Sequence, residues 1–323
     1  MRATLIDQHR GLPRVGEVST PQPAGGQSLV AVKAAALNPL DVDFASGQHR
    51  VGPTQFPYIP GFEGVGAVVE SDVLPIGQRV RFECRPTFAT GGSLAEYAVV
   101  ANEWAFPLPD GIPDATAAAL GQVGITVWTA LEWRAGLRQG EAVLVLGATG
   151  ATGQLAVQVA RLLGARRIVA AGRHAAALAR TRELGADATV ELGRERSADE
   201  LTQALRHAAD GPIDVVLDAL WGASLAAALP IVARGARIVN YGSAASSMAD
   251  LPSALLRFQG ITLLGHNSML PPREVVADTY RRLVEHAARG EVTTALEELS
   301  LTQIAEAWQR QRFSPHTKLV IVF

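Results

Sequence analysis

The sequence is poor in the residues that build disulfides and metal centres, because Cys84 is its only cysteine. One thiol cannot form an internal disulfide, and it cannot supply a four-cysteine zinc site. Lysine is almost as rare: Lys33 and Lys318 are the only lysines among 29 basic residues, and the arginines are scattered along the chain. The formal charge is −2, so no surplus of positive charge would attract nucleic acid or an anionic membrane.

Long apolar runs are also missing, and none could span a bilayer. Near the start of the chain, the uncharged stretch between Arg2 and Asp7 is too short for the core of a signal peptide. The content of 48% hydrophobic and 19% charged residues is typical of a folded protein, and 323 residues suggest two domains of ~100–200 residues each. We therefore expect a cytoplasmic, two-domain enzyme or binding protein.

The first ~110 residues predict a β-rich domain. Leu29–Leu37, Gly64–Glu70 and Gln78–Glu83 are rich in valine, alanine or leucine, and clusters of glycine and proline separate them. Short strands broken by many turns indicate a compact, strongly bent sheet or barrel.

From about Pro113 the pattern becomes one of alternating helices and strands. A long apolar helix is expected over Asp114–Glu132, and later helices over Gly153–Leu163 and Ala175–Leu184. The expected strands are Ala142–Leu146, Arg167–Ala171, Ala188–Glu191, Ile213–Asp218, Ala236–Asn240 and Ile261–Gly265. Strands that alternate with helices favour an α/β fold, a doubly wound parallel sheet of the Rossmann type with helices on both faces.

The alternation stops after Gly265. Helices are expected over Arg273–Arg289 and Thr302–Arg310, and the final run Leu319–Phe323 reads as a strand. Our hypothesis is that this strand rejoins the N-terminal sheet. The β-rich domain would then be discontinuous, over residues 1–112 and 266–323, around a Rossmann domain over residues 113–265.

A glycine-rich turn joins the first expected strand of the Rossmann domain to its helix. The turn is Gly147-Ala148-Thr149-Gly150-Ala151-Thr152-Gly153. A pyrophosphate can approach backbone N–H groups at a helix N-terminus only where side chains do not block it, which is why such turns are rich in glycine. The spacing is G-x-x-G-x-x-G rather than G-x-G-x-x-G. The alternative is a βα turn that merely packs.

The end of the second strand predicts which dinucleotide binds. An NAD-binding fold would offer Asp or Glu to the ribose at about this point, but here Gly172 and Arg173 stand there. A carboxylate would repel a 2′-phosphate, whereas a guanidinium would hydrogen-bond it. The pattern therefore favours NADPH. The alternative for Arg173 is a solvated surface residue.

Several motifs in register resemble the zinc-free quinone oxidoreductase (zeta-crystallin-like) branch of the medium-chain dehydrogenase/reductases. The resemblance covers essentially the whole chain. Its motifs are Asn38-Pro39-Leu40-Asp41 for N-P-x-D, Gly61-Phe62-Glu63-Gly64-Val65-Gly66 for G-x-E-x-x-G, Gly92-Ser93-Leu94-Ala95-Glu96-Tyr97 for G-x-x-A-E-Y, and Gly124-Ile125-Thr126 ahead of the glycine turn.

The resemblance implies a bent, GroES-like catalytic domain beside the Rossmann domain, and a homodimer. It also implies further cofactor contacts after the fifth and sixth strands, near Asn240, Tyr241, Gly242, Ser243 and Gly265. The substrate would be a small molecule, with loops around Ser46–Pro57 and His266–Pro272 setting its identity.

The sequence departs from the zinc alcohol dehydrogenases that this family also contains. Phe62 stands where their G-H-E motif has a zinc-binding histidine, and the cysteine expected near Asn38 is absent. Catalytic zinc needs about three protein ligands, so no metal is expected. We interpret His9, His49 and His316 as surface residues.

The sequence also departs from the quinone oxidoreductases themselves. They often carry a tyrosine after the third strand that helps hold the 2′-phosphate, and Leu192 occupies that region here. Their tyrosine on the nicotinamide side is also missing, since Phe44 and Gln48 lie in the stretch after Asp41.

The implied reaction is hydride transfer from NADPH to a quinone or to the β-carbon of an enone. Asn38 and Thr126 are the candidates for orienting nicotinamide and substrate, although Asn38 could instead cap a helix that starts at Pro39. Asp41 is expected to fix its loop. No residue is an obvious general acid. Two alternatives stay open: an enone or alkenal reductase that rejects quinones, and an NADPH-binding sensor or binding module with little turnover.

The missing zinc ligands lead to a first prediction. Purified protein should contain no stoichiometric zinc, and a chelator should leave its activity unchanged. Elemental analysis of the purified chain checks this. One tightly bound zinc ion per chain would overturn the zinc-independent assignment.

Overall fold

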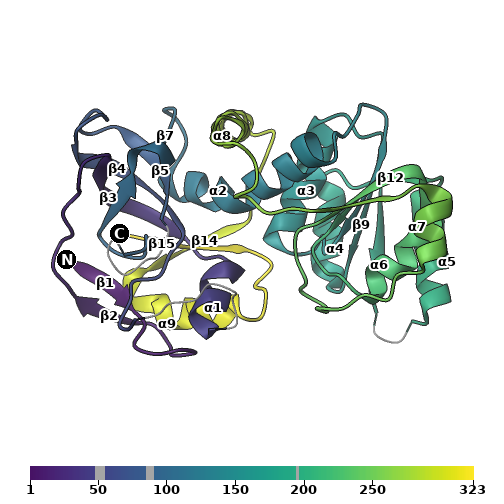
Figure 1. The fold of residues 1–323 in the computed structure, drawn as a ribbon, viewed down its shortest axis with the longest axis horizontal. Coiled ribbons are helices and arrows are strands. Elements are labelled where there is room, and N and C mark those ends of the chain that lie inside the picture. Colours follow the sequence, from purple (N-terminus) through teal and green to yellow (C-terminus); the bar gives the residue numbers. More distant parts are fainter. Residues whose placement is uncertain (48–54, 85–90, 194–195) are drawn as a thin grey trace. The chain divides into compact units, whose positions relative to one another are not determined.

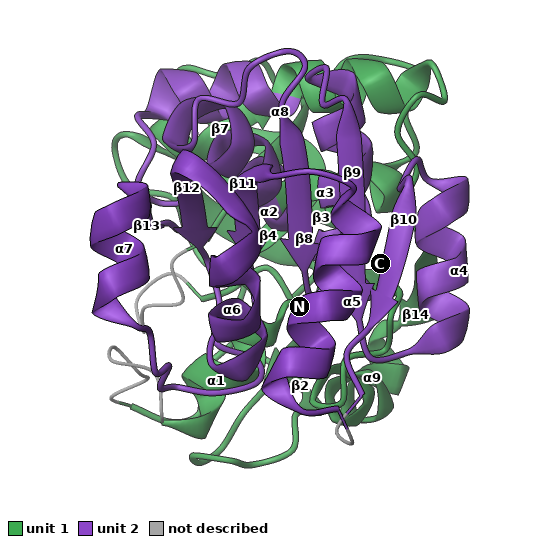
Figure 2. Ribbon diagram, turned by 90° about the vertical axis from the view of Figure 1, so that its right-hand side faces the viewer, with its two compact units in different colours: residues 1–121, 281–323 green, residues 122–280 purple. Residues whose placement is uncertain are grey.

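The chain forms two compact units in the computed structural model, which describes residues 1–47, 55–84, 91–193 and 196–323. The first unit contains residues 1–121 and 281–323, and the second contains residues 122–280 (Figures 1 and 2). Both boundaries fall inside helices, α2 (Asp114–Thr129) and α8 (Arg273–Ala288). The predicted domain limits, after residues 112 and 265, lie shortly before these two helices.

The first unit is mainly β-sheet. Its strands are β1 (Arg2–Leu5), β2 (Arg14–Glu17), β3 (Gln27–Ala36), β4 (Glu63–Ser71), β5 (Arg79–Glu83), β6 (Tyr97–Ala101), β7 (Ala105–Pro107), β14 (Leu296–Ser300) and β15 (Lys318–Val322). Its helices, besides the parts of α2 and α8, are α1 (Pro39–Ser46), η1 (Asn102–Trp104), η4 (Leu301–Gln303) and α9 (Ile304–Gln311).

The C-terminal strand β15 is built into the N-terminal sheet. The strand order is β14-β15-β3-β4-β5-β7, with β6 also paired to β3. β15 runs antiparallel to β3, and Ile321 lies opposite Ala35. The hypothesis that the last strand rejoins this sheet is confirmed. Leu319 and Ile321 are buried in one core with Phe82 and Trp308, so the strand belongs there for hydrophobic reasons as well.

The second unit alternates strands and helices. Its strands are β8 (Ala142–Leu146), β9 (Arg167–Gly172), β10 (Ala188–Glu191), β11 (Ile213–Asp218), β12 (Val232–Asn240) and β13 (Thr262–Gly265). Its helices are η2 (Ala130–Arg134), α3 (Ala151–Leu162), α4 (Ala175–Glu183), α5 (Ala198–Ala209), α6 (Ala223–Ala228), η3 (Leu229–Ile231) and α7 (Ser253–Gln259).

The strands of the second unit form one parallel sheet in the order β10-β9-β8-β11-β12-β13. The doubly wound fold is therefore confirmed. Every residue of the central strand β8 is buried, as expected for a strand covered on both faces. Figures 1 and 2 show α3 on one face of this sheet and α5 and α6 on the other. β12 begins earlier than predicted, because the exposed pair Arg234 and Gly235 interrupts its apolar pattern.

The helix predicted over Asp114–Glu132 is not one regular helix. Its backbone breaks at Gly121 (φ −50°, ψ −107°), and a π-helical turn, η2, replaces its last residues. A Cβ atom at Gly121 would lie 2.0 Å from Oε2 of Glu63. The buried carboxylate of Glu63 therefore occupies the space beside the break, which only glycine leaves open. In the described part of the chain, no helix is both long and apolar enough to cross a membrane.

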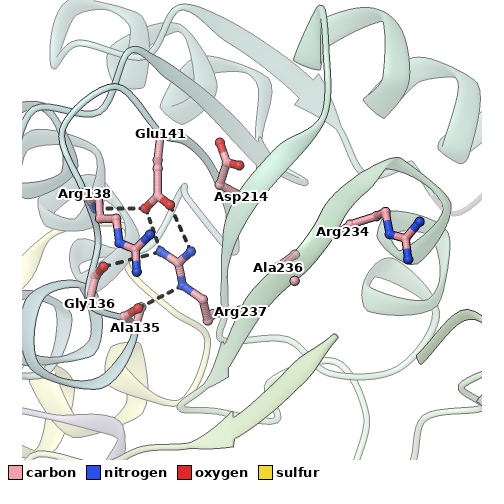
Figure 3. Close-up of a pocket in the computed structure, with 9 residues that line it drawn as sticks. Ala135, Gly136, Arg138, Glu141, Asp214, Arg234, Ala236 and Arg237 are labelled. Atoms are coloured by element: carbon pink, nitrogen blue, oxygen red, sulfur yellow. Dashed lines mark hydrogen bonds and ion pairs between the residues drawn. The ribbon is translucent and has the colours of Figure 1, made fainter. Parts of the chain in front are cut away.

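Arg237 and Glu141 form an ion pair at the amino-terminal ends of the strands of the second unit's sheet, which is the end opposite the glycine turn. Arg237 of β12 donates to both carboxylate oxygens of Glu141, at 2.6 and 2.9 Å, and to the Ala135 carbonyl at 2.9 Å (Figure 3). These residues line a cavity of about 390 Å³. Arg234 lines it too, but Figure 3 shows its guanidinium pointing away from the pair. Only 20% of the Arg237 side chain and 16% of the Glu141 side chain are exposed, so we interpret this partly buried ion pair, which we call the joint, as structural.

The joint leads to a second prediction. Arg237 lowers the pKa of Glu141, chiefly through its hydrogen bonds. Because the folded-state pKa is depressed, the pair's contribution is present above the unfolded pKa of about 4.3 and is lost as the pH falls through the folded pKa. Glu141→Gln should cost ~1–3 kcal/mol of unfolding free energy at neutral pH, and less in acid. Urea unfolding across that pH range measures it.

A matched control is Glu285→Gln, because the Arg281–Glu285 pair is exposed on α8. Its cost should stay below about 0.5 kcal/mol. Equal costs for the two variants, or a Glu141→Gln cost that does not shrink in acid, would contradict this role for the joint.

Candidate functional site

The glycine turn is pinned to the neighbouring strand by its own backbone. The N–H groups of Gly147 and Ala148 both donate to the carbonyl of Ala171, the residue before the last of β9, at 2.9 Å each. Gly147 has φ +92°, a left-handed conformation that favours glycine. The turn then leads into α3, whose N-cap is Gly150. The strand-turn-helix order predicted for residues 142–163 is confirmed.

Two other glycines of the turn have different roles. A Cβ atom at Gly153 would lie 2.3 Å from the Gly147 carbonyl oxygen, so this residue lets the helix approach the turn. At Gly150 the nearest atom would be 3.9 Å away, and its φ of −76° is open to any residue. Neither the space nor the backbone angle at Gly150 therefore requires glycine. Gly150 leaves space at the N-terminus of α3.

Thr149 and the first turn of α3 are tied together by buried amides. The side chain of Gln154 donates to the Thr149 carbonyl at 3.0 Å, and Gln158 donates to the Gln154 carbonyl at 3.2 Å. All three residues are buried. Ala151 and Thr152 lie between them, at the start of the helix. Gln154 was not recognised in the sequence. Its amide on an otherwise apolar helix face is the signal that could have identified it.

The end of β9 presents a cation to solvent. Gly172 is the last residue of the strand, and the exposed Arg173 has no hydrogen-bond or ion-pair partner among the described residues. Next to it, Nδ1 of His174 accepts from the Ala177 N–H and so caps α4. Leu192 is buried in the core of this unit, and its N–H donates to the Gly172 carbonyl. Its side chain is therefore used in packing.

Asp218, at the end of β11, organises the loops after two strands. One carboxylate oxygen accepts from the N–H groups of Leu220 and Trp221 at 3.0 Å each, and the other accepts from the Asn240 amide at 3.0 Å. Asn240 also donates to the Gly242 carbonyl at 2.8 Å. Burial raises the pKa of Asp218. The sequence pattern predicted Asp218 only as the last residue of a strand. A carboxylate at the end of an apolar strand is the signal that could have indicated its role in holding the loops.

Tyr241, Gly242 and Ser243 follow β12 directly. The Tyr241 N–H donates to the Asp218 carbonyl at 2.9 Å, and its buried hydroxyl has no partner among the described residues. A Cβ atom at Gly242 would lie 2.8 Å from the Ala219 carbonyl oxygen, so the two loops touch here. Ser243 is exposed.

Gly265 ends the edge strand β13, and its carbonyl accepts from Arg134 at 3.0 Å. The next residue, His266, is buried, and its Nε2 lies 3.0 Å from the hydroxyl of Thr129. Burial lowers the pKa of His266 to about 4, so the imidazole is neutral at physiological pH.

The parallel register brings these residues to one edge of the sheet. Leu146 lies opposite Ala171, Asp218 opposite Leu146 and Asn240, and Asn240 opposite Gly265. The glycine turn, Arg173, and the loops after β12 and β13 therefore all follow carboxyl ends of neighbouring strands. Ligands of open α/β sheets bind at this edge.

Asn38 lies in the first unit and is buried among charged groups. Its side-chain amide donates to Oε1 of Glu63 at 2.9 Å and to the Ala36 carbonyl at 3.3 Å, while its Oδ1 accepts from Lys318 at 2.5 Å. Both amide hydrogens are thus engaged within the protein. Asn38 is also the N-cap residue of α1, as one of the two alternatives had it, and Asp41 accepts from its backbone N–H at 2.8 Å.

The groups around Asn38 form a buried polar cluster. Glu63 pairs with Arg81 at 3.2 Å, and Asp41, Glu63, Arg81 and Lys318 are all almost fully buried. Burial lowers the pKa of Lys318, and it raises the pKa of Asp41 to about 7, partly offset by the hydrogen bond from Asn38. The bond from Asn38 supports the expectation that Asp41 fixes its loop.

The remaining candidates are placed as follows. Thr126 lies on α2 in the second unit, and its hydroxyl donates to the Gln122 carbonyl at 2.7 Å. Phe62 packs edge-to-face on Phe44, with ring centroids 5.4 Å apart. His9 is exposed and His316 is half-buried. Gln48 and His49 lie outside the described residues. Within the described ranges, no group of three or more His, Cys, Asp or Glu side chains could hold a metal.

Comparison with known proteins gives two family matches. Residues 24–110 match the alcohol dehydrogenase GroES-like domain, and residues 151–288 match the zinc-binding dehydrogenase family. Together the two stretches cover more than half of the chain.

Among curated proteins, the chain is similar to two kinds of enzyme. It is 32% identical to a phenolphthiocerol/phthiocerol polyketide synthase of Mycobacterium tuberculosis, over 95% of this chain but only 14% of that protein. It is 29% identical to the quinone oxidoreductase of Sus scrofa, over 70% of this chain and 68% of that enzyme, and 27% identical to the human one, over 75% and 73%.

Solved structures share the fold over the whole chain. An alcohol dehydrogenase superfamily protein from Novosphingobium aromaticivorans has a TM-score of 0.85 at 26% identity, covering 100% of this chain and 99% of that one. A mycobacterial quinone oxidoreductase has a TM-score of 0.86 at 20% identity, covering 100% of both chains. A mycobacterial protein complexed with NADPH has a TM-score of 0.85 at 20% identity, again over 100% of both.

Three kinds of observation agree with one another: the two family matches, the fold shared over the full chain, and the motifs around Asn38, Glu63 and the glycine turn. The chain belongs to the quinone oxidoreductase branch of the medium-chain dehydrogenase/reductase family.

Proposed function

We propose that this oxidoreductase uses NADPH to transfer a hydride to a quinone or an α,β-unsaturated carbonyl compound, without zinc. The quinone oxidoreductase relatives support the substrate class. Two features of the sequence support zinc independence. Phe62 stands where the zinc enzymes have a histidine ligand, and Cys84 is the only cysteine of the chain. As part of this proposal, the enzyme acts as a homodimer.

The carboxyl edge of the second unit's sheet fits a dinucleotide. The single observation that carries the proposal is the open space at Gly150, where the first amides of α3 are left without an obstructing side chain. A helix N-terminus of this kind attracts a pyrophosphate through its unpaired N–H groups and its dipole. The unpartnered hydroxyl of Tyr241, a residue held beside Asp218 and Asn240, is a further polar group at this edge of the described structure.

The residues after β9 favour the 2′-phosphorylated cofactor. Gly172 offers no carboxylate to a ribose diol, and Arg173 is an exposed cation without a partner among the described residues. Arg180, also exposed, lies on the helix that follows and could share the phosphate. The side chain of Leu192 packs in the core and has no hydrogen-bond donor, so it adds no second donor for the 2′-phosphate.

When bound, NADPH supplies the hydride, and the chain's own residues orient the reactants and exclude water. Thr126 presents a hydroxyl whose proton is bonded to Gln122, so it can still accept a hydrogen bond. Asn38 has both amide hydrogens engaged, so its contribution is to hold the β3–α1 connection rather than to donate to substrate. The proton that completes the reduction would then come from solvent.

A second candidate is reduction of enones alone, without activity on quinones. It is favoured by the polyketide synthase relative, which is named for phthiocerol synthesis rather than for quinone reduction and to which 95% of this chain aligns. The third candidate, a cofactor-dependent sensor, predicts tight binding without turnover.

A substrate panel separates these functions. We expect NADPH oxidation with quinones and with enones, at rates above those with NADH. The loss of NADPH is followed by its absorbance, and the hydroquinone or saturated ketone that forms is quantified by chromatography. Turnover confined to enones would select the second candidate, and tight NADPH binding with no turnover on either class would select the third.

Gly150→Val tests the phosphate site. The space and backbone angle at Gly150 accept a side chain, so the variant should fold, but its methyl groups would occupy the pyrophosphate position. NADPH affinity, measured by fluorescence titration, should fall by at least about a hundredfold, or ~2.7 kcal/mol. Gly153→Ala is the contrasting variant, because it should lose thermal stability first. Normal NADPH binding by folded Gly150→Val would remove this turn as the phosphate site.

Arg173→Ala tests the cofactor preference. A charge-assisted hydrogen bond contributes roughly 1.5–3 kcal/mol, which is about ten- to a hundredfold in affinity. The variant should lose that much affinity for NADPH and almost none for NADH. Arg180→Ala is the control for sharing of the phosphate. Wild type that prefers NADH would refute the cofactor assignment, whereas equal losses for both cofactors would show that Arg173 supports its loop instead.

A further inference from the structure

We propose that Thr149 is a specificity-determining residue that excludes the NAD-type carboxylate from the end of β9. Its side chain fills the space into which any side chain at position 172 would have to grow. This inference rests on the proposed NADPH function. It adds a physical reason why residue 172 is glycine rather than Asp or Glu.

The contact between Thr149 and Gly172 carries the inference. A Cβ atom at Gly172 would lie 2.4 Å from Cγ2 of Thr149, 3.0 Å from its Oγ1 and 3.2 Å from its Cβ. These are the nearest atoms, and all belong to one side chain. Rotation about χ1 of Thr149 carries Cγ2, Oγ1 and the Cβ hydrogen in turn through three staggered positions, so in every rotamer at least one of the two γ heavy atoms occupies one of the two positions that face Gly172. The obstruction therefore persists as long as residue 149 is threonine.

The backbone on either side of Thr149 is also fixed by hydrogen bonds. It is 7% exposed, and Gln154 donates to its carbonyl at 3.0 Å. The turn that carries it is fixed to β9 by the two bonds from Gly147 and Ala148 to Ala171. Moving Thr149 away from Gly172 would require this part of the turn to move, and overpacking of such a site is destabilising.

The consequence concerns the ribose. NAD-binding folds place Asp or Glu at the end of the second strand, where it binds the ribose hydroxyls. Gly172 is that last residue here. With Thr149 beside it, a carboxylate cannot be added by one substitution, and Arg173 then stands as the first side chain that meets the ribose end of the cofactor. Thr149 and Gly172 act as a matched pair.

The steric part of the proposal is tested without cofactor. Gly172→Ala should lower the unfolding midpoint by several degrees, and the same substitution in a Thr149→Ala background should lower it much less. Gly193→Ala is the matched control, because Gly193 is exposed near the same sheet edge and no atom of the described residues lies within 4 Å of a Cβ placed there. It should change the midpoint little in either background. Equal losses for Gly172→Ala with threonine or alanine at position 149 would overturn the proposal.

The specificity part uses Gly172→Asp. In the wild-type background this variant should lose stability and bind neither cofactor well. In the Thr149→Ala background it should fold and should shift the ratio of NADH to NADPH affinity toward NADH by at least about tenfold. Fluorescence titration of both cofactors gives the ratio. A single Gly172→Asp variant that folds and binds NADH as well as the double variant does would contradict the role of Thr149.

The outcomes also separate this inference from the proposed function. Wild type that prefers NADH refutes the NADPH assignment by itself, and it leaves the stability coupling between positions 149 and 172 to be read independently. Wild type that prefers NADPH, together with no coupling between the two positions, refutes only the inference.

Discussion

The close backbone contact between the start of α3 and the turn before it is the constraint on which the candidate site depends. Because Gly153 has no side chain, α3 begins directly against the carbonyl of Gly147, while Gly147 and Ala148 are bonded to β9. This contact fixes the direction in which the first amides of the helix point. It also leaves Gly150 as the uncovered position beside those amides, so packing and ligand access are divided between different glycines of one turn.

The same contact makes neighbouring strand ends depend on one another. With the turn bonded to Ala171, the side chain of Thr149 comes to rest on Gly172, and Arg173 follows as the first residue after the strand. At the other side of β8, Asp218 gathers the loop after its own strand and the loop after β12. A cofactor edge of this kind is assembled by backbone N–H groups and buried polar side chains, and only its outermost residues remain to recognise the ligand.

Sequence patterns predicted the elements of the second unit because buried parallel strands appear as unbroken apolar runs. β8 and β11 were placed at their observed bounds. Where polar or small residues interrupt a pattern, prediction failed: β12 begins before Arg234, and α2 breaks at Gly121. The break at Gly121 depends on a carboxylate distant in sequence, so no local pattern could have revealed it.

The site residues show the same limit. The glycine turn and Arg173 could be located because their spacing from strand ends has a chemical reason, whereas the partners of Asn38 could not. Lys318 is 280 positions away along the chain and reaches Asn38 only because β15 enters the N-terminal sheet. Such a pairing takes a buried cation and a buried amide out of water together, and each satisfies the other. The chemistry that a residue such as Asn38 can offer is therefore set by the partners that the fold brings to it. Because the side-chain amide of Asn38 already donates to Glu63 and Ala36, it serves better as part of the scaffold than as a hydrogen-bond donor to a ligand.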